Sequence, residues 1–128
     1  MSVQFNHSII AAWDRDLSAS FFASVFGLPE PTSWGPFSGV NLGEGVHLQF
    51  AQPQWADIQP QHYAFLVDDA TFDQIYARMR SNGIEHWADP QGTLPQQINT
   101  HHGGRGVYFR DPTGHGFEII TRPYGSLA

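Results

Sequence analysis

The chain contains no cysteine, which excludes disulfide frameworks and thiolate metal sites. A cytoplasmic location is compatible with this absence. The N-terminal stretch MSVQFNHSII lacks a basic region followed by a long apolar run, so no signal peptide is expected. No apolar run approaches the roughly 20 residues that a membrane-spanning helix needs, so we expect no membrane partner.

Basic residues are scarce as well. Lys and Arg together number 6 against 12 Asp and Glu, and the formal net charge is −6. This balance argues against a nucleic-acid partner and against binding to an anionic membrane surface. The 7 histidines outnumber Lys and Arg, which favours metal or proton chemistry. The 128 residues, 41% of them hydrophobic, suffice for a single compact domain.

The order strand, helix and three strands occurs twice along the chain. In the first copy we expect strands at 3–12, 32–34, 38–42 and 46–51 and a helix at 16–26. In the second copy we expect strands at 62–67, 84–87, 106–110 and 116–121 and a helix at 71–81. A polar loop rich in Pro and Gly occupies 88–104.

The two copies also match at single positions, which indicates an internal repeat. The matches, in chain order, are His7 with His62, Leu17 with Phe72, Phe21 with Tyr76, GVNL (39–42) with GVYF (106–109), and Gln49 with Glu118. In this alignment the turn before the last strand is two residues longer in the second copy. The common order of the matches, rather than any one of them, carries the prediction.

The repeat singles out His7, His62, Gln49 and Glu118. Side chains alternate across a strand, so Glu118 points away from its neighbours Phe117 and Ile119. If the two copies form one curved sheet, the four positions converge on its concave side. Two imidazoles and one carboxylate, with the amide oxygen of Gln49, suit a divalent first-row metal and leave a net ligand charge of about −1.

Structural interpretations compete with this metal site. His7 alone is typical of a hydrogen-bonded residue, Gln49 alone of a solvated one, and Glu118 alone can pair with Arg122 or Arg105. The four residues together favour the metal. His47, His86 and His115 are interpreted as structural. His101 and His102 occupy a glycine-rich loop, which favours a role as plain surface residues over the alternative of an acid or base.

These residues resemble the vicinal oxygen chelate superfamily, which includes glyoxalase I, extradiol dioxygenases and bleomycin-binding proteins. The pattern is a His on the first strand, a helix that ends in Gly-Leu, an Asp-Pro-x-Gly-His turn and a Glu on the last strand. Here its elements are His7, Gly27-Leu28, Asp111 to His115, and Glu118. The resemblance implies an α+β fold with two βαβββ modules, at about 1–53 and 61–128 with a connector at 54–60, a cup-shaped mixed sheet and a homodimer.

The resemblance also implies roles for single residues. His7, His62 and Glu118 match the metal ligands, Gln49 matches a fourth ligand of glyoxalase I, and the metal is Ni, Zn, Mn or Fe. A glutamine cannot abstract a proton, so Glu118 would serve as the base by leaving the metal transiently. Tyr108 resembles a tyrosine beside the iron of extradiol dioxygenases. The candidate substrate-binding residues are Tyr108, His102, Asn99 and Arg122.

Three functions remain open at this point. The first is a metal-dependent lyase or isomerase of the glyoxalase type, acting on a small substrate that chelates through vicinal oxygens. The second is an Fe(II) dioxygenase that cleaves an aromatic diol. The third is a binding or resistance protein without turnover, in which Trp13, Trp34, Trp55 and Trp87 form an aromatic cup for a planar ligand.

Overall fold

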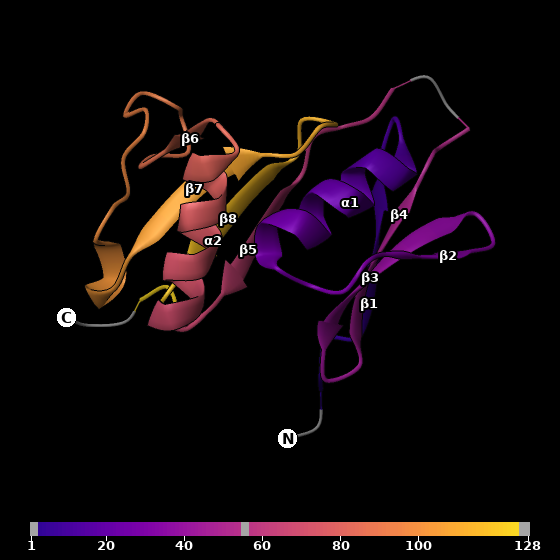
Figure 1. Cartoon of the computed structure of the whole chain (residues 1–128), viewed down its shortest axis with the longest axis horizontal. Helices are drawn as coiled ribbons and strands as arrows, with labels where there is room; N and C mark the ends of the chain where they lie inside the picture. Colours follow the sequence, from indigo (N-terminus) through magenta and orange to yellow (C-terminus); the bar gives the residue numbers. More distant parts are fainter. Residues whose placement is uncertain (1–2, 55–56, 126–128) are drawn as a thin grey trace. The chain divides into compact units, whose positions relative to one another are not determined.

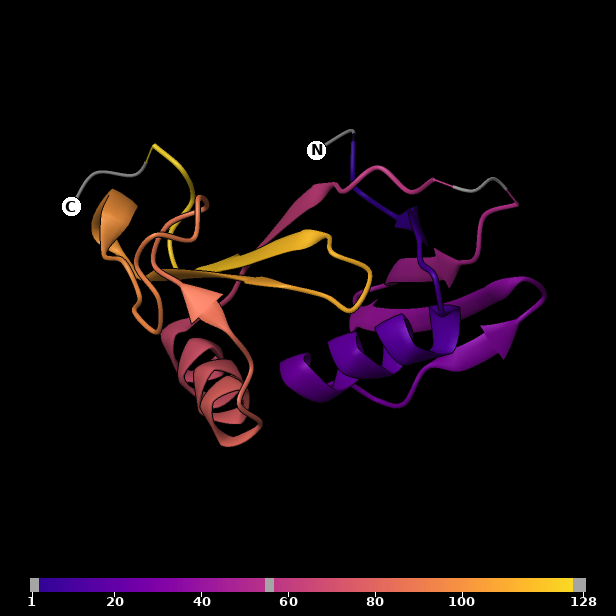
Figure 2. The ribbon, with the colours of Figure 1, turned by 90° about the horizontal axis from the view of Figure 1, so that it is seen from above.

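The chain folds into two compact units. The computed structural model describes residues 3–54 and 57–125, and the units span 1–59 and 60–128. Each unit contains one long helix and one four-stranded sheet, and each helix lies on one face of its own sheet (Figures 1 and 2). Trp55 of the expected aromatic cup lies outside the described residues.

The first unit contains β1 (His7–Ala11), α1 (Arg15–Phe26), β2 (Thr32–Trp34), β3 (Phe37–Gly43) and β4 (Val46–Ala51). The strand order in its sheet is β1-β4-β3-β2. Strand β1 runs parallel to β4, whereas β2 to β4 form an antiparallel meander.

The second unit contains β5 (His62–Leu66), α2 (Asp69–Ser81), β6 (His86–Trp87), the short 3₁₀ turn η1 (His101–Gly103), β7 (Gly106–Arg110) and β8 (Gly116–Ile120). Its strand order, β5-β8-β7-β6, repeats that of the first unit, with β5 parallel to β8. The predicted α+β fold with two βαβββ modules is therefore confirmed. The structure has two mixed sheets, and their union into one cup-shaped sheet stays a prediction.

Local signals in the sequence explain where the helices and the first hairpin begin and end. Asp14 precedes α1 and accepts hydrogen bonds from the backbone N–H groups of Asp16 and Leu17, and Gly27 ends the helix with φ 69°. Glu44 and Gly45 connect β3 to β4, with φ 54° and 79°. Positive φ at both positions is the geometry of a two-residue hairpin turn between these strands.

Each helix covers one face of its sheet with apolar side chains. The fully buried ones include Ile10, Phe22, Val40 and Phe50 in the first unit and Phe72, Ile75, Phe109, Phe117 and Ile119 in the second. Phe117 is at the centre of an aromatic cluster, because its ring meets those of Tyr63, Phe65 and Phe109 edge-on at 5.7–5.9 Å. The opposite face of each sheet carries the candidate site residues, and among the described residues no α-helix of the same unit lies on it.

The structure corrects the predicted repeat in its helix, where Leu17 and Phe21 were matched with Phe72 and Tyr76, and in one strand. Leu17 does not match Phe72, because its side chain is 55% exposed whereas that of Phe72 is fully buried. The capping Asp14 lies seven residues after His7, but Asp68 lies six residues after His62, so α1 is displaced by one residue. Buried Ser18 is therefore the residue that corresponds to Phe72.

The second correction concerns the strand before the last turn. In the β-ladders Gly39 lies opposite Gln49, and Tyr108 lies opposite Glu118. Gly39 therefore corresponds to Tyr108, not to Gly106, and the turn is not longer in the second copy. Because the error was two residues, it preserved the side-chain alternation, and the match of Gln49 with Glu118 is unaffected.

We predict that Phe117→Ala lowers the free energy of unfolding by about 3–5 kcal/mol, because it removes the centre of the aromatic cluster beside Glu118. Urea denaturation followed by circular dichroism measures the change. Leu94→Ala, in a loop of the same unit where the side chain is 46% exposed, is the control and should change stability by less than about 1 kcal/mol. Equal losses in the two variants would contradict the assigned core.

Candidate metal centre

His62 and Glu118 form an imidazole–carboxylate pair on the open face of the second sheet. His62 Nε2 donates to Glu118 Oε1 at 2.9 Å. Their strands are adjacent and parallel, with His62 opposite Gly116 and Ala64 opposite Glu118. A Cβ on Gly116 would lie 3.3 Å from His62 Nδ1, so glycine leaves room for the imidazole at this position. The two predicted ligands of this unit are thus in contact.

The second oxygen of Glu118 is held by a tyrosine from the C-terminal segment. Tyr124 Oη donates to Glu118 Oε2 at 2.6 Å, and Tyr108 Oη lies 3.1 Å from Tyr124 Oη. Since the hydrogen of Tyr124 is directed at the carboxylate, Tyr108 donates to Tyr124. Only 2% of the Glu118 side chain is exposed, and its two oxygens have partners that a buried carboxylate requires.

The same contacts shift the acidity of both phenols. The hydrogen bond to Glu118 is the main reason that the pKa of Tyr124 is raised above its ordinary value. Burial is the main reason that the pKa of Tyr108 lies far above its ordinary value, and the hydrogen bond with Tyr124 adds to the effect. Both phenols are therefore protonated donors at neutral pH.

His102 connects the loop at 88–104 to the C-terminal segment. Its ring stacks on Tyr124 with a centroid distance of 4.4 Å, and its Nδ1 accepts a hydrogen bond from Gly125 N at 3.1 Å. His102 has a φ of 58°, which is uncommon for a residue other than glycine. The structure thus links His102 to Glu118 through the intervening Tyr124 ring.

The turn between β7 and β8 positions the strand that carries His62. Asp111 Oδ1 accepts hydrogen bonds from the N–H groups of Thr113, Gly114 and His115. His115 is 1% exposed, and its Nδ1 accepts the N–H of Gln61 at 2.9 Å. Burial raises the pKa of Asp111, whose Oδ2 is buried without a partner. His115 is thus structural, as predicted.

His86 is also structural, as predicted. Its side chain is buried, its Nε2 lies 3.1 Å from Tyr76 Oη, and its Nδ1 donates to the carbonyl of Ile84 at 2.9 Å.

In the first unit, His7 and Gln49 share the open face of the sheet. In the parallel β1–β4 ladder, His7 lies opposite His47 and Ile9 lies opposite Gln49. His47 and Gln49 line a cavity of about 330 Å³. From the sequence, His47 is interpreted as structural, although the alternation of side chains along β4 places it on the same face as Gln49. The parallel register shows that it is a direct neighbour of His7.

Asn6 orients the ring of His7. His7 Nδ1 donates to Asn6 Oδ1 at 2.6 Å, and Asn6 Nδ2 donates to the carbonyl of Gly45 at 3.2 Å. This arrangement leaves the lone pair of His7 Nε2 available. Histidine ligands of metals commonly donate their other ring N–H in this way.

The donor atoms fit a divalent first-row ion. Two ligand atoms that are each about 2.1 Å from an ion lie about 3 Å apart when they subtend about 90°. The 2.9 Å between His62 Nε2 and Glu118 Oε1 agrees with that separation. Within the described residues no three His, Asp or Glu side chains form a metal-binding group. His7 and Gln49 belong to the other unit, so the grouping of all four stays a prediction.

Several other expectations can be compared with the structure. The predicted alternative in which Glu118 pairs with Arg105 is wrong, because Arg105 binds Asp69 and Asp73. The alternative with Arg122 is also wrong, since the partners of Glu118 are His62 and Tyr124.

The amide of Asn99 organises the loop, and its role in substrate binding stays a prediction. Its Nδ2 donates to the carbonyl of Ala88 at 2.8 Å, and its Oδ1 accepts from His101 N at 3.2 Å.

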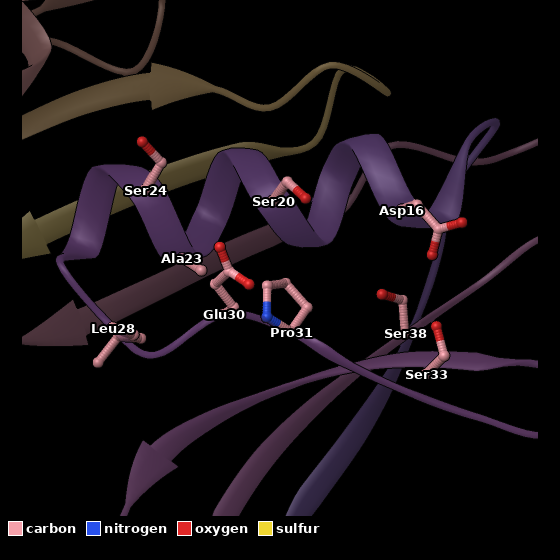
Figure 3. Close-up of a pocket in the computed structure, with 9 residues that line it drawn as sticks. All are labelled: Asp16, Ser20, Ala23, Ser24, Leu28, Glu30, Pro31, Ser33 and Ser38. Carbon is pink, nitrogen blue, oxygen red and sulfur yellow. The ribbon is translucent and has the colours of Figure 1, made fainter.

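A larger groove lies on the helix side of the first unit, between α1 and the strands β2 and β3 (Figure 3). Its volume is about 510 Å³, and its polar lining consists of Asp16, Ser20, Ser24, Glu30, Ser33 and Ser38. None of the predicted metal ligands lines this groove. The groove lies on the helix side of the sheet, because Ser38, which lines it, points to that side. Gln49 points to the opposite side.

The fold consists of two βαβββ modules, and the second module carries the histidine–carboxylate pair. Residues 4–119 match the sequence profile of the Glyoxalase/Bleomycin resistance protein/Dioxygenase superfamily, and the chain belongs to this superfamily. The resemblance drawn from the sequence is therefore confirmed.

Characterised relatives of the chain include oxidases and transferases. The solved structures of oxidase ChaP-H1 and oxidase ChaP-H2 are each 50% identical to it, with TM-scores of 0.91 and 0.90. They cover 98% of this chain, and the matches span 100% and 98% of those chains. Glutathione transferase FosA of Serratia marcescens is 27% identical, over 100% of this chain and 85% of the relative.

Other relatives extend this range. Metallothiol transferase FosB of Shouchella clausii is 28% identical, over 96% of this chain and 81% of the relative. The relatives are thus named as enzymes. No helix among the described residues is long and apolar enough to cross a membrane.

We predict that His115→Ala weakens divalent-metal binding although His115 is not a ligand. The variant removes the buried imidazole that accepts the N–H of Gln61, next to His62, at a cost of about 1–3 kcal/mol in the free energy of unfolding. Calorimetric titration with Zn²⁺ and urea denaturation measure the two effects. His101→Ala, an exposed histidine of the same unit, should leave both unchanged. Unaltered binding and stability in His115→Ala would contradict the assigned role.

Proposed function

We propose that this protein is a metal-dependent oxidase that acts on a small substrate chelated through neighbouring oxygen atoms. The observation that carries the proposal is the His62–Glu118 pair, two donor atoms 2.9 Å apart on an open sheet face. The 50% identity with two oxidases over nearly the whole chain supports the reaction class. The dioxygenase alternative drawn from the sequence thus ranks above the glyoxalase type.

The ligand set in this proposal consists of His7, His62 and Glu118, with Gln49 as a neutral fourth donor. A divalent ion held there supplies Lewis acidity toward substrate oxygens and, when the ion is iron, a centre at which O₂ reacts. Asn6 holds the His7 ring so that Nε2 is the available nitrogen. Tyr124 holds the second oxygen of Glu118.

The surroundings of the pair favour a planar, oxygen-rich substrate such as a phenol or diol. Tyr108 lies beside His62, with ring centroids 6.0 Å apart, and its hydroxyl is near Glu118 through Tyr124. A cavity of about 40 Å³ there is lined by residues that include His62, Trp87 and Tyr108. The Arg110 guanidinium lies over the Trp87 ring at 4.9 Å.

A glyoxalase-type isomerase is the second candidate, and Gln49 is the observation that favours it. Gln49 lies on the open face of the first sheet, as a fourth ligand of that enzyme type requires. A lactoylglutathione lyase from Agrobacterium tumefaciens has a TM-score of 0.70 at 22% identity, a likeness that shows the fold alone. Proton transfer would then depend on Glu118, whose oxygens are held by His62 and Tyr124.

Three of the arginines argue against a pocket for an anionic substrate. Arg105 is neutralised by Asp69 and Asp73. Arg15 binds the carbonyl of Gly35, and Arg80 lies near the Tyr76 ring. These side chains are committed elsewhere, which weakens the case for a cationic pocket.

We predict that the purified protein binds one divalent ion per chain and that the ligand variants lose it. His62→Ala and Glu118→Gln should each lower Zn²⁺ or Mn²⁺ affinity by at least about 100-fold, because each removes a donor. His7→Ala should do the same. Elemental analysis and calorimetric titration measure the effect, with His101→Ala as the control.

A mixing experiment extends this test to the origin of the ligands. The His7→Ala and Glu118→Gln proteins are mixed and their metal binding is measured. The mixture regains a complete ligand set only if the ligands of one ion come from two different chains. A wild-type protein that binds none of Ni²⁺, Zn²⁺, Mn²⁺ and Fe²⁺ would sink the proposed function.

We also predict O₂ consumption by the Fe²⁺-loaded protein in the presence of diphenolic substrates. Anaerobic loading followed by oxygen-electrode recording with a panel of catechols and polycyclic phenols measures the rate. Glu118→Gln should abolish uptake, because it disrupts the ligand set. The same preparations with Ni²⁺ and the methylglyoxal–glutathione hemithioacetal test the second candidate. Isomerisation without oxygen uptake would favour the glyoxalase type instead.

A further inference from the structure

The segment after the last strand returns to the candidate metal centre. Residues 121–125 follow β8 and bring Tyr124 back to Glu118, six residues earlier in the chain. The superfamily match ends at residue 119, so this segment lies beyond the matched residues. Tyr124 was also not among the residues singled out by the repeat. Its position close to a predicted ligand therefore calls for a separate explanation.

We infer that Tyr124 is a positioning residue that holds Oε2 of Glu118, so that Oε1 alone faces His62 and the metal. The inference rests on the proposed metal-dependent function. Oε1 lies 2.9 Å from His62 Nε2, and Oε2 lies 2.6 Å from Tyr124 Oη. A carboxylate with one oxygen bound in this way offers a metal one donor instead of two. One coordination position is thereby kept for a substrate oxygen.

Two further contacts hold Tyr124 in place. Tyr108 donates a hydrogen bond to its hydroxyl at 3.1 Å, from a strand position directly opposite Glu118. The His102 ring stacks on its ring at a centroid distance of 4.4 Å, with the planes inclined by 25°. Gly125 N donates to His102 Nδ1 at 3.1 Å, which fixes the chain on the far side of Tyr124.

This arrangement gives His102 a role different from the acid or base considered in the sequence. Its Nδ1 accepts a hydrogen bond from the backbone of Gly125, and its ring stacks on Tyr124, so His102 supports Tyr124. The loop at 88–104 and the C-terminal segment are thereby joined beside Glu118. A substitution in this loop is therefore expected to alter metal binding through its effect on Tyr124.

The test compares Tyr124→Phe with wild-type protein, using Zn²⁺ and Co²⁺ as probes without substrate. The variant keeps the ring that stacks on His102 but loses the hydroxyl. We expect Zn²⁺ affinity to fall by about 10- to 100-fold, as for other partners of metal ligands. We also expect a changed visible absorption of bound Co²⁺, because a freed Oε2 raises the coordination number.

The matched control is Tyr76→Phe, which removes a different tyrosine–histidine hydrogen bond in the same unit, that of Tyr76 Oη with His86 Nε2. It should alter neither the affinity nor the spectrum. His102→Ala should lower affinity by less than Tyr124→Phe, and the neighbouring His101→Ala should not lower it.

The outcomes separate this inference from the proposed function. Wild-type protein that binds no metal contradicts the proposed function and the inference together. Wild-type and Tyr124→Phe proteins with equal Zn²⁺ affinity and identical Co²⁺ spectra overturn the inference alone. A lower melting temperature of the metal-free variant with unchanged metal binding also overturns it, since it reveals a merely structural hydroxyl.

Discussion

The burial of Glu118 is the constraint on which the candidate site depends. A carboxylate that is 2% exposed must have partners for both oxygens, because an unpaired buried charge is costly. The fold provides them from two directions: His62 on the neighbouring parallel strand and Tyr124 on the returning C-terminal segment. In the proposed site the same two contacts would determine which oxygen meets a metal, so stability and chemistry would share one set of interactions.

The architecture explains how that pair is assembled. A parallel β5–β8 ladder brings the first and last strands of a module together, which sequence separation would not suggest. The Asp111 turn and His115 fix the start of β5 through Gln61, one residue before His62. On the opposite face of β8, Phe117 packs against Phe109 in the aromatic cluster. The His62–Glu118 pair therefore rests on a packed and hydrogen-bonded support.

The first module has the same topology with different chemistry. His7 occupies the position of His62, and neutral Gln49 occupies that of Glu118. Its open face adds His47 beside His7, where the second module has Gly116. In the proposed ligand set, one acidic and one neutral half would lower the negative charge around an ion, which would stay Lewis-acidic.

Much of the fold was predictable because its signals are local. Strand β7 was predicted with its observed limits, and β2 and β4 likewise, because turn residues flank alternating apolar positions. The match of Leu17 with Phe72 was wrong by one residue, because the apolar periodicity of a helix does not reveal the length of the connector before it. The match of Gly39 with Gly106 was wrong by two residues, because a shift of two residues preserves the alternation of side chains across a strand.

The sequence by itself determined the two modules, the superfamily and the residue types at His7, His62, Gln49 and Glu118. It did so because strand alternation, glycine turns and the repeat are properties of short segments. Only the tertiary structure decided that Glu118 binds His62 and Tyr124 and that His102 supports Tyr124. Those contacts join positions separated by 56, 6 and 22 residues, and side-chain geometry across such separations depends on the packed fold rather than on local pattern.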